Sequence, residues 1–306
     1  MNRIFLVVIV IVIFYIGYIG YSDFNEFSNN IKNLKFEFIP IILLFSFIPL
    51  AILTIRQKIL LKSIDIKISN KENFLLYLSG LSFIITPGGA GEAIKTYFLK
   101  KKYNHKIAKT IPLVLVEKYT DLISVITIIA IFSIIIQINE IIIAMSVIGI
   151  VTLITYITIR IKKMFELGLK ILKKIKPLSK FTDTISESYE GIYLMTSPKI
   201  MLKSCSISIS VWSIEAIAIY LVFLSFNTDI GFIQTTLIMY SSVIIGAVSL
   251  LPAGIGVTEV SATHFLLKEG LEISLVTSIV FIVRLTSIWF ATAIGFIASK
   301  IIWKKI

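Results

Sequence analysis

Ionisable side chains occur inside long apolar runs of this 306-residue sequence, where membrane-spanning helices are expected. Glu117 and Asp121 are four residues apart, so a helix places both carboxylates on one face. Glu215 and Arg284 each lie well inside a later apolar run. A charged group at that depth costs about 2.5–3.5 kcal/mol and should face the bundle interior beside a partner. The pattern predicts a polar substrate path formed by Glu117, Asp121, Arg284 and Glu215.

A purely structural ion pair is the alternative for these charges. In that interpretation Glu117 or Asp121 pairs with Arg284 and joins two parts of the bundle. A buried pair adds little net stability, because desolvation offsets most of the Coulombic gain. The functional interpretation is therefore preferred, although the two roles can coexist.

A glycine-rich phrase, Pro-x-Gly-x-Gly followed closely by Glu, occurs twice, at 86–92 and 251–259. Each phrase breaks a helix and leaves free N–H groups at the start of the next one. Those groups can hold an anionic headgroup, with a nearby lysine as countercharge. The glutamates can instead cap them. The predicted headgroup-binding residues are Pro87, Gly88, Gly89, Gly91, Glu92, Lys95, Pro252, Gly254, Gly256 and Glu259.

The composition is that of an all-α polytopic membrane protein. Hydrophobic residues make up 57% of the chain and the mean hydropathy is +0.93. Several apolar stretches reach the roughly 20 residues that span a bilayer. About six spans are expected, at 3–21, 38–56, 110–137, 140–160, 204–225 and 273–299, within a single membrane domain covering 1–306. The first run is too long for a signal-peptide core and is expected to be a retained anchor.

The lysines and arginines predict the topology. Of the 30, 25 fall at the termini or in alternate connections, and the loops between hold only Lys32, Lys35 and Lys268. By the positive-inside rule both termini are cytoplasmic, in a multi-pass protein of the cell membrane. The net charge of +12 is thus assigned to cytoplasmic loops, and no nucleic-acid partner is expected.

This topology makes the two glycine-rich phrases the turns of hairpins. The apolar run 74–86 is too short to span and is flanked by cytoplasmic charges, which predicts a re-entrant helical hairpin. A second hairpin, about 233–267, has both ends outside, and its first arm is long enough to span. The prolines are 165 residues apart, and the same offset aligns the flanking spans. An inverted-topology repeat is predicted, with repeat 1 at about 38–137 and repeat 2 at about 204–299.

The segment 161–198 is predicted to lie on the cytoplasmic membrane surface. Met164, Phe165, Gly168, Ile171, Leu172 and Ile175 recur at helical spacing, and lysines occupy the remaining face. Such a basic amphipathic segment favours an anionic lipid surface as its partner.

Several chemistries have no motif here. One cysteine and two histidines predict no disulfide framework, metal site or redox cofactor. HExxH, GxSxG, aspartate-rich and GxxxxGK[ST] motifs are absent from the sequence, so no catalytic residue and no enzyme activity are predicted.

The ordered set Pro87-Gly88-Gly89-Ala90-Gly91-Glu92, Glu117-Lys118-x-x-Asp121 and Pro252 to Glu259 resembles the transmembrane flippase domain of the lysylphosphatidylglycerol synthases. The resemblance covers about 1–303. It implies movement of a lipid, or a lipid-linked headgroup, between leaflets. Lys95 and Lys118 stand where that family usually has arginine, and lysine lacks the bidentate fork. The soluble aminoacyl-transferring domain has no counterpart, so lipid aminoacylation is not expected.

We therefore predict a lipid translocase whose partner is a membrane phospholipid or a lipid-linked substrate. A small-solute or ion secondary transporter is the alternative, because it uses the same inverted-repeat architecture. A membrane-embedded lipid transferase is a weaker alternative. The prediction names neither the lipid nor an oligomeric state.

Overall fold

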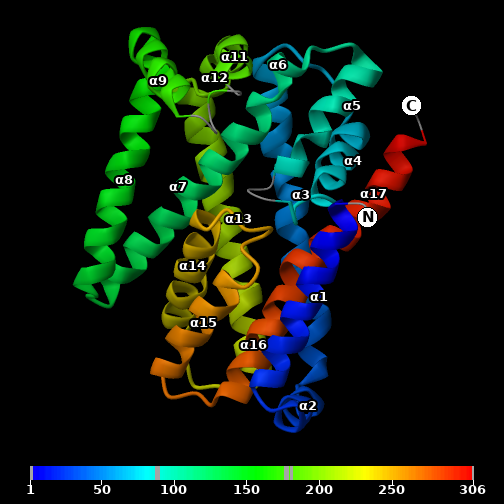
Figure 1. Ribbon diagram of the computed structural model, residues 1–306, viewed down its shortest axis with the longest axis vertical. Helices are drawn as coiled ribbons and strands as arrows, with labels where there is room; N and C mark the ends of the chain where they lie inside the picture. Colours follow the sequence, from blue (N-terminus) through cyan, green and yellow to red (C-terminus); the bar gives the residue numbers. More distant parts are fainter. Residues whose placement is uncertain (1–2, 87–89, 176–178, 180–181, 305–306) are drawn as a thin grey trace. The chain divides into compact units, whose positions relative to one another are not determined.

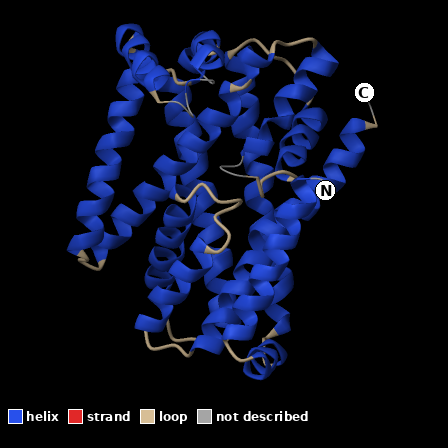
Figure 2. Ribbon diagram, viewed as in Figure 1, coloured by secondary structure: helices blue, strands red, loops and turns tan. Residues whose placement is uncertain are grey.

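The computed structural model describes residues 3–86, 90–175, 179 and 182–304. These residues form helices joined by loops, with no strand among them (Figure 2). The expected all-α polytopic membrane protein is confirmed.

Among the described residues, five helical segments are long and apolar enough to cross a membrane. They are Phe36–Ser63 (η1, Phe36–Phe38, and α3, Ile39–Ser63), Ile107–Ile135 (α6, Ile107–Thr110, and α7, Pro112–Ile135), Asn139–Arg160 (α8), Pro198–Ser225 (α13) and Ile273–Trp303 (α16, Ile273–Arg284, η3, Leu285–Trp289, and α17, Phe290–Trp303). The remaining expected span, 3–21, is α1 (Arg3–Tyr21), and its segment Val10–Tyr21 belongs with the shorter apolar helices.

Two spans extend furthest beyond their expected ends, in both cases into basic sequence. The helix expected at 38–56 continues to Ser63, and the helix expected at 204–225 already begins at Pro198, where proline suits a first helical turn. Lysine and arginine are good helix formers, so the loss of hydropathy marks the end of the apolar stretch and not the end of the helix. Arg56, the last residue of the expected span 38–56, therefore lies inside α3 and not at its end.

The described chain divides into two compact units. Unit 1 comprises Met1–Pro49, Leu81–Gly91 and Ile214–Phe296; unit 2 comprises Leu50–Gly80, Glu92–Ser213 and Ile297–Ile306. The helices α3, α13 and α17 contribute residues to both units. Neither unit coincides with one of the predicted repeats, which remain a prediction.

Unit 2 contains most of the two arms of the first hairpin, whereas the residues Leu81–Gly91 between them belong to unit 1. The arms are α4 (Asn70–Leu81) and α5 (Ile94–Tyr103), and a short turn, η2 (Ala90–Ala93), leads into α5. At about 1.5 Å per residue neither arm reaches the roughly 30 Å needed to cross the hydrocarbon core. The arms pack closely at Gly80. A Cβ added to this residue would lie only 3.0 Å from the Lys95 side chain on the other arm. The short paired arms agree with a hairpin that enters the membrane only part-way.

Further helices of unit 2 follow the first hairpin along the chain. After α6, α7 and α8 come α9 (Lys162–Lys174), α11 (Thr182–Glu187) and α12 (Tyr189–Met195). Helices α7 and α8 pack together, and α12 packs on α7.

Unit 1 contains the second hairpin. Besides α1 and α16 it holds α2 (Phe24–Lys32), and α14 (Phe232–Val248) and α15 (Val257–Lys268) lie side by side (Figure 1). Small residues permit this approach, since a Cβ on Gly246 would lie 2.0 Å from Thr258 Oγ1. The connecting loop holds left-handed backbone at Leu250, Ala253 and Gly254, and again at Gly256.

Candidate functional site

One turn of α7 carries three charged residues, and each pairs with a different element of unit 2. Glu117 pairs with Lys95 on α5, Lys118 pairs with Glu92 on η2, and Asp121 pairs with Arg56 on α3. The turn therefore connects the first hairpin to a membrane-spanning helix through opposite charges. Because each carboxylate has a cationic partner, this charge cluster of unit 2 is balanced internally.

The Lys95–Glu117 pair is fully buried. Lys95 Nζ lies 2.5 Å from Glu117 Oε2, and the two side chains are 0% and 2% exposed. The ammonium also lies 5.2 Å from the centre of the Tyr77 ring, in cation–π geometry. Glu117 Oε1 is buried and has no hydrogen-bond partner among the described residues. Lys95, expected to face a headgroup directly, thus holds Glu117 in this structure.

The Arg56–Asp121 pair belongs to a larger hydrogen-bond network. Arg56 Nη2 donates to Asp121 Oδ2 at 3.4 Å, while Nη1 donates to Asp121 Oδ1, to Thr120 Oγ1 at 3.2 Å and to Ser208 Oγ at 2.6 Å. Trp212 Nε1 donates to the same carboxylate at 3.4 Å. Arg56 is buried, whereas Asp121 is 19% exposed. Asp121 is thus a partly accessible carboxylate held by several donors.

The sequence did not predict Arg56 as a site residue, because Arg56 was grouped with the basic residues that flank the membrane. A usable signal exists: the chain has only four arginines among its 30 basic residues. Arginine suits buried ion pairs better than lysine, since its planar guanidinium donates bidentately and is weakly hydrated. Arg56 and Arg284 are both buried in ion pairs, and Arg160 packs on the Tyr193 ring.

Glu92 and Lys118 form the pair closest to the first glycine-rich phrase. The Glu92 side chain is 5% exposed and that of Lys118 is 41% exposed. Nearby, Gly91 donates its N–H to Thr86 Oγ1 at 2.6 Å, and a Cβ on Gly91 would collide with Phe83. The predicted residues Pro87, Gly88 and Gly89 lie outside the described residues.

In unit 1, Glu259 is the centre of a second charge cluster. Its Oε1 accepts from Arg284 Nε at 2.7 Å and from Tyr15 Oη at 2.9 Å. Its Oε2 accepts from the Gly256 N–H at 2.7 Å, which confirms the capping interpretation for this glutamate. Both members of the ion pair are almost fully buried, at 5% and 0% exposure.

Arg284 also fixes the second glycine-rich loop. Its Nη2 donates to the Ala253 carbonyl at 2.8 Å. Gly254 and Gly256 adopt φ values of +64° and +90°, which glycine tolerates at little cost. A π-helical turn, η3, follows Arg284 directly, and such turns are frequent at functional sites. Pro252 is partly buried in this loop.

The predicted path residues thus fall into two groups. Glu117 and Asp121 belong to unit 2, and Glu215 and Arg284 belong to unit 1. Glu215 on α13 is half-buried and interacts electrostatically with Tyr240 on α14. The ion pair between the α7 carboxylates and Arg284, considered from sequence, is replaced by partners within each unit.

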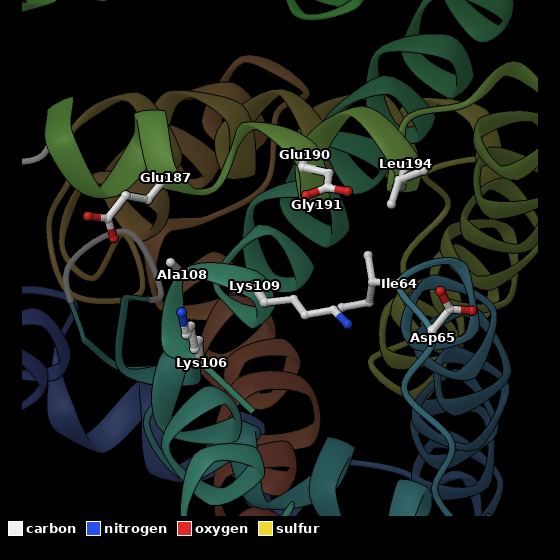
Figure 3. A pocket seen from close by; sticks show the side chains of 9 residues that line it. All are labelled: Ile64, Asp65, Lys106, Ala108, Lys109, Glu187, Glu190, Gly191 and Leu194. Atoms are coloured by element: carbon white, nitrogen blue, oxygen red, sulfur yellow. The ribbon is translucent and has the colours of Figure 1, made fainter. Parts of the chain in front are cut away.

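A cavity of about 470 Å³ lies elsewhere in unit 2, between the turn after α3, α6 and the α11–α12 segment. Charged side chains of both signs surround it (Figure 3). They are Asp65, Lys106, Lys109, Glu187 and Glu190. None of the residues predicted for the path or the hairpin turns lines this cavity.

A helical membrane domain with two hairpins and buried ion pairs inside its apolar segments defines a polytopic membrane protein with a polar interior. The sequence profile described as "Lysylphosphatidylglycerol synthase TM region" matches residues 4–295. The chain belongs to this family.

Similar proteins occur in archaea. A UPF0104 membrane protein of Pyrococcus horikoshii is 27% identical over 292 residues, which cover 85% of each chain. A UPF0104 membrane protein of Methanocaldococcus jannaschii is 25% identical and covers 72% of this chain and 94% of its own length. A third, from Methanothermobacter thermautotrophicus, is 23% identical and covers 82% of this chain and 81% of its own.

Proposed function

We propose that this protein moves a phospholipid, or a lipid-linked headgroup, between the leaflets of the cell membrane. The observation that carries the proposal is a repeated ion pair. In each half of the sequence, the glutamate after the glycine-rich phrase pairs with a cation on the next long helix, as Glu92 does with Lys118 and Glu259 with Arg284. Membership of the family with the lysylphosphatidylglycerol synthase membrane region supports the same function.

The ion pairs solve a physical problem of such transport. An anionic headgroup crossing the hydrocarbon needs cationic and hydrogen-bonding partners, but an unpaired cation there is costly when no substrate is bound. The carboxylates of Glu259, Glu92 and Asp121, which pair with Arg284, Lys118 and Arg56, lower that cost. A phosphate entering the path then exchanges with a carboxylate as the partner of the same cation.

The proposed path uses Glu117, Asp121, Arg284 and Glu215, with the two hairpin turns as headgroup sites. Both termini are cytoplasmic on this proposal, and the hairpins enter from opposite faces as an inverted repeat. The substrate leaves chemically unchanged, so the protein acts as a translocase and not as an enzyme.

Lipid flipping in proteoliposomes tests the proposal. The purified chain is reconstituted with a headgroup-labelled phospholipid, and a membrane-impermeant reductant reports how fast inner-leaflet label becomes accessible. We expect Arg284→Ala and Asp121→Asn to slow exchange strongly, whereas Lys268→Ala, at the exposed end of α15, should not. Wild-type rates in both folded path variants would contradict the path. Uptake of an aqueous solute without lipid exchange would favour the solute-transporter alternative.

A further inference from the structure

Helix α9 presents three distinct faces. The first packs against unit 2: Phe165 is 8% exposed and its ring lies 4.4 Å from that of Tyr189. Gly168 on the same face approaches Thr158 at the end of α8. This face anchors α9 to its own unit.

The second face of α9 is apolar and exposed. Met164, Leu167 and Ile171 recur at three- and four-residue intervals, and Ile175 follows at the helix end. Their exposed fractions are 38%, 59%, 56% and 43%. A stripe of large apolar side chains is unfavourable in water, so it indicates a covering partner.

The third face is basic. Lys163, Lys170 and Lys174 lie along the edge next to the exposed apolar stripe, and Lys162 and Lys173 extend the same face. Glu166 is the single acidic residue of α9. A basic edge beside an apolar stripe is the pattern of helices that lie in the membrane interface.

The position of α9 directly after α8 indicates that lipid covers the exposed apolar stripe. Helix α8 is apolar and only 11% of its apolar window is buried, as expected for a span surrounded by lipid. It ends at Arg160, and Ile161 leaves the helical conformation at φ −105° and ψ 105°. Figure 1 shows α9 turning away from the end of α8. The exposed stripe therefore begins where the lipid-facing span ends.

We propose that α9 lies in the headgroup layer of the adjoining leaflet and recruits anionic phospholipid. Met164, Leu167 and Ile171 reach the acyl boundary, while Lys163, Lys170 and Lys174 contact lipid phosphates. The attraction of each surface lysine for an anionic leaflet corresponds to roughly a fivefold change in local affinity. The inference rests on the three faces of α9 and on its position directly after α8, and it does not depend on translocation.

Site-directed spin labelling tests the placement of the apolar stripe. In a Cys205→Ser background, the full chain carries a nitroxide at Leu167→Cys or, as the matched control, at Glu166→Cys. Both are reconstituted in phosphatidylcholine vesicles containing phosphatidylglycerol. We expect the Leu167 label to be accessible to oxygen and shielded from a water-soluble nickel chelate, with the reverse at Glu166. Equal chelate access at both positions overturns the placement, and shielding from both reagents at Leu167 overturns it in favour of a covering protein.

A lysine series tests the lipid charge. We expect Lys163→Gln, Lys170→Gln and Lys174→Gln together to reduce enrichment of spin-labelled phosphatidylglycerol at the protein at least tenfold. The control Lys67→Gln, Lys199→Gln and Lys203→Gln removes the same charge from exposed positions outside α9. Equal losses in the two triple variants, or equal enrichment of phosphatidylcholine and phosphatidylglycerol in the wild type, overturn the proposal.

Discussion

Arg284 Nε donates to Glu259 Oε1 across 2.7 Å, and the two residues are 25 positions apart in the sequence. In the other half of the chain Glu92 pairs with Lys118, 26 positions further on. Each glutamate follows a glycine-rich phrase and each cation lies on the following long helix. Two ion pairs with such similar spacing support a duplicated unit more directly than the repeated glycines do.

The Glu259–Arg284 pair should be sensitive to removal of one partner. We expect Glu259→Gln to destabilise the protein by about 3–5 kcal/mol, because it leaves a buried guanidinium uncompensated. Thermal unfolding in detergent measures the loss. The double variant Glu259→Gln with Arg284→Met should recover much of it, and a double variant no more stable than Glu259→Gln would contradict the compensation.

Gly254 tests the close packing of the second hairpin. A Cβ there would lie 2.7 Å from Thr258 Oγ1 and 3.1 Å from the Gly246 backbone, at a φ of +64°. Gly270 is the matched control, since its φ is +84° but nothing lies within 4 Å. Gly270→Ala should cost only the left-handed penalty of about 1–2 kcal/mol. We expect Gly254→Ala to lower the unfolding temperature further than Gly270→Ala, and equal effects would rule out a packing role.

Substitutions at Arg56 test whether the site requires only a positive charge or the bidentate hydrogen bonding of a guanidinium. Arg56→Lys keeps the charge beside Asp121 but cannot reproduce the contacts to Thr120 and Ser208 together. We expect it to destabilise the protein by about 1–2 kcal/mol, and Arg56→Met by about 3–5 kcal/mol. If the two variants were equally stable in the same unfolding assay, the ion pair with Asp121 would not be the important contact.

Glu72, at the start of α4 and outside the spans, should make the first hairpin sensitive to acid. Hydrogen bonds from Lys102, Tyr103 and Ser69 lower the pKa of its carboxyl from 4.5 to about 2. The folded-state pKa is depressed, so the stabilisation is complete above about pH 4.5 and is lost as the pH falls towards 2.

Glu72→Gln should therefore be less stable than the wild type at neutral pH, and the difference should shrink between about pH 4.5 and 2. Unfolding curves across this range measure it. Lys102→Gln, which removes the largest cause of the shift, should move the loss to higher pH. A difference between wild type and Glu72→Gln that does not change with pH would refute the role of this carboxylate.

Hydropathy predicted most of the spanning helices, because the bilayer restricts what a spanning segment can be. The helices around 110–137 and 140–160 and the short arms of the first hairpin follow from that restriction. The partners of the buried charges did not follow, since tertiary contact depends on packing that periodicity does not encode. Arg56 shows the limit: it lies at the end of the apolar run of α3, beside further basic residues, yet it is 1% exposed.

The rate of lipid exchange in proteoliposomes tests the central claim most directly. The wild-type chain should expose inner-leaflet labelled phospholipid at least tenfold faster than protein-free vesicles do, and Asp121→Asn should fall most of the way to the protein-free rate. Exchange no faster than in protein-free vesicles, from folded wild-type protein with a range of headgroups, would contradict a lipid translocase.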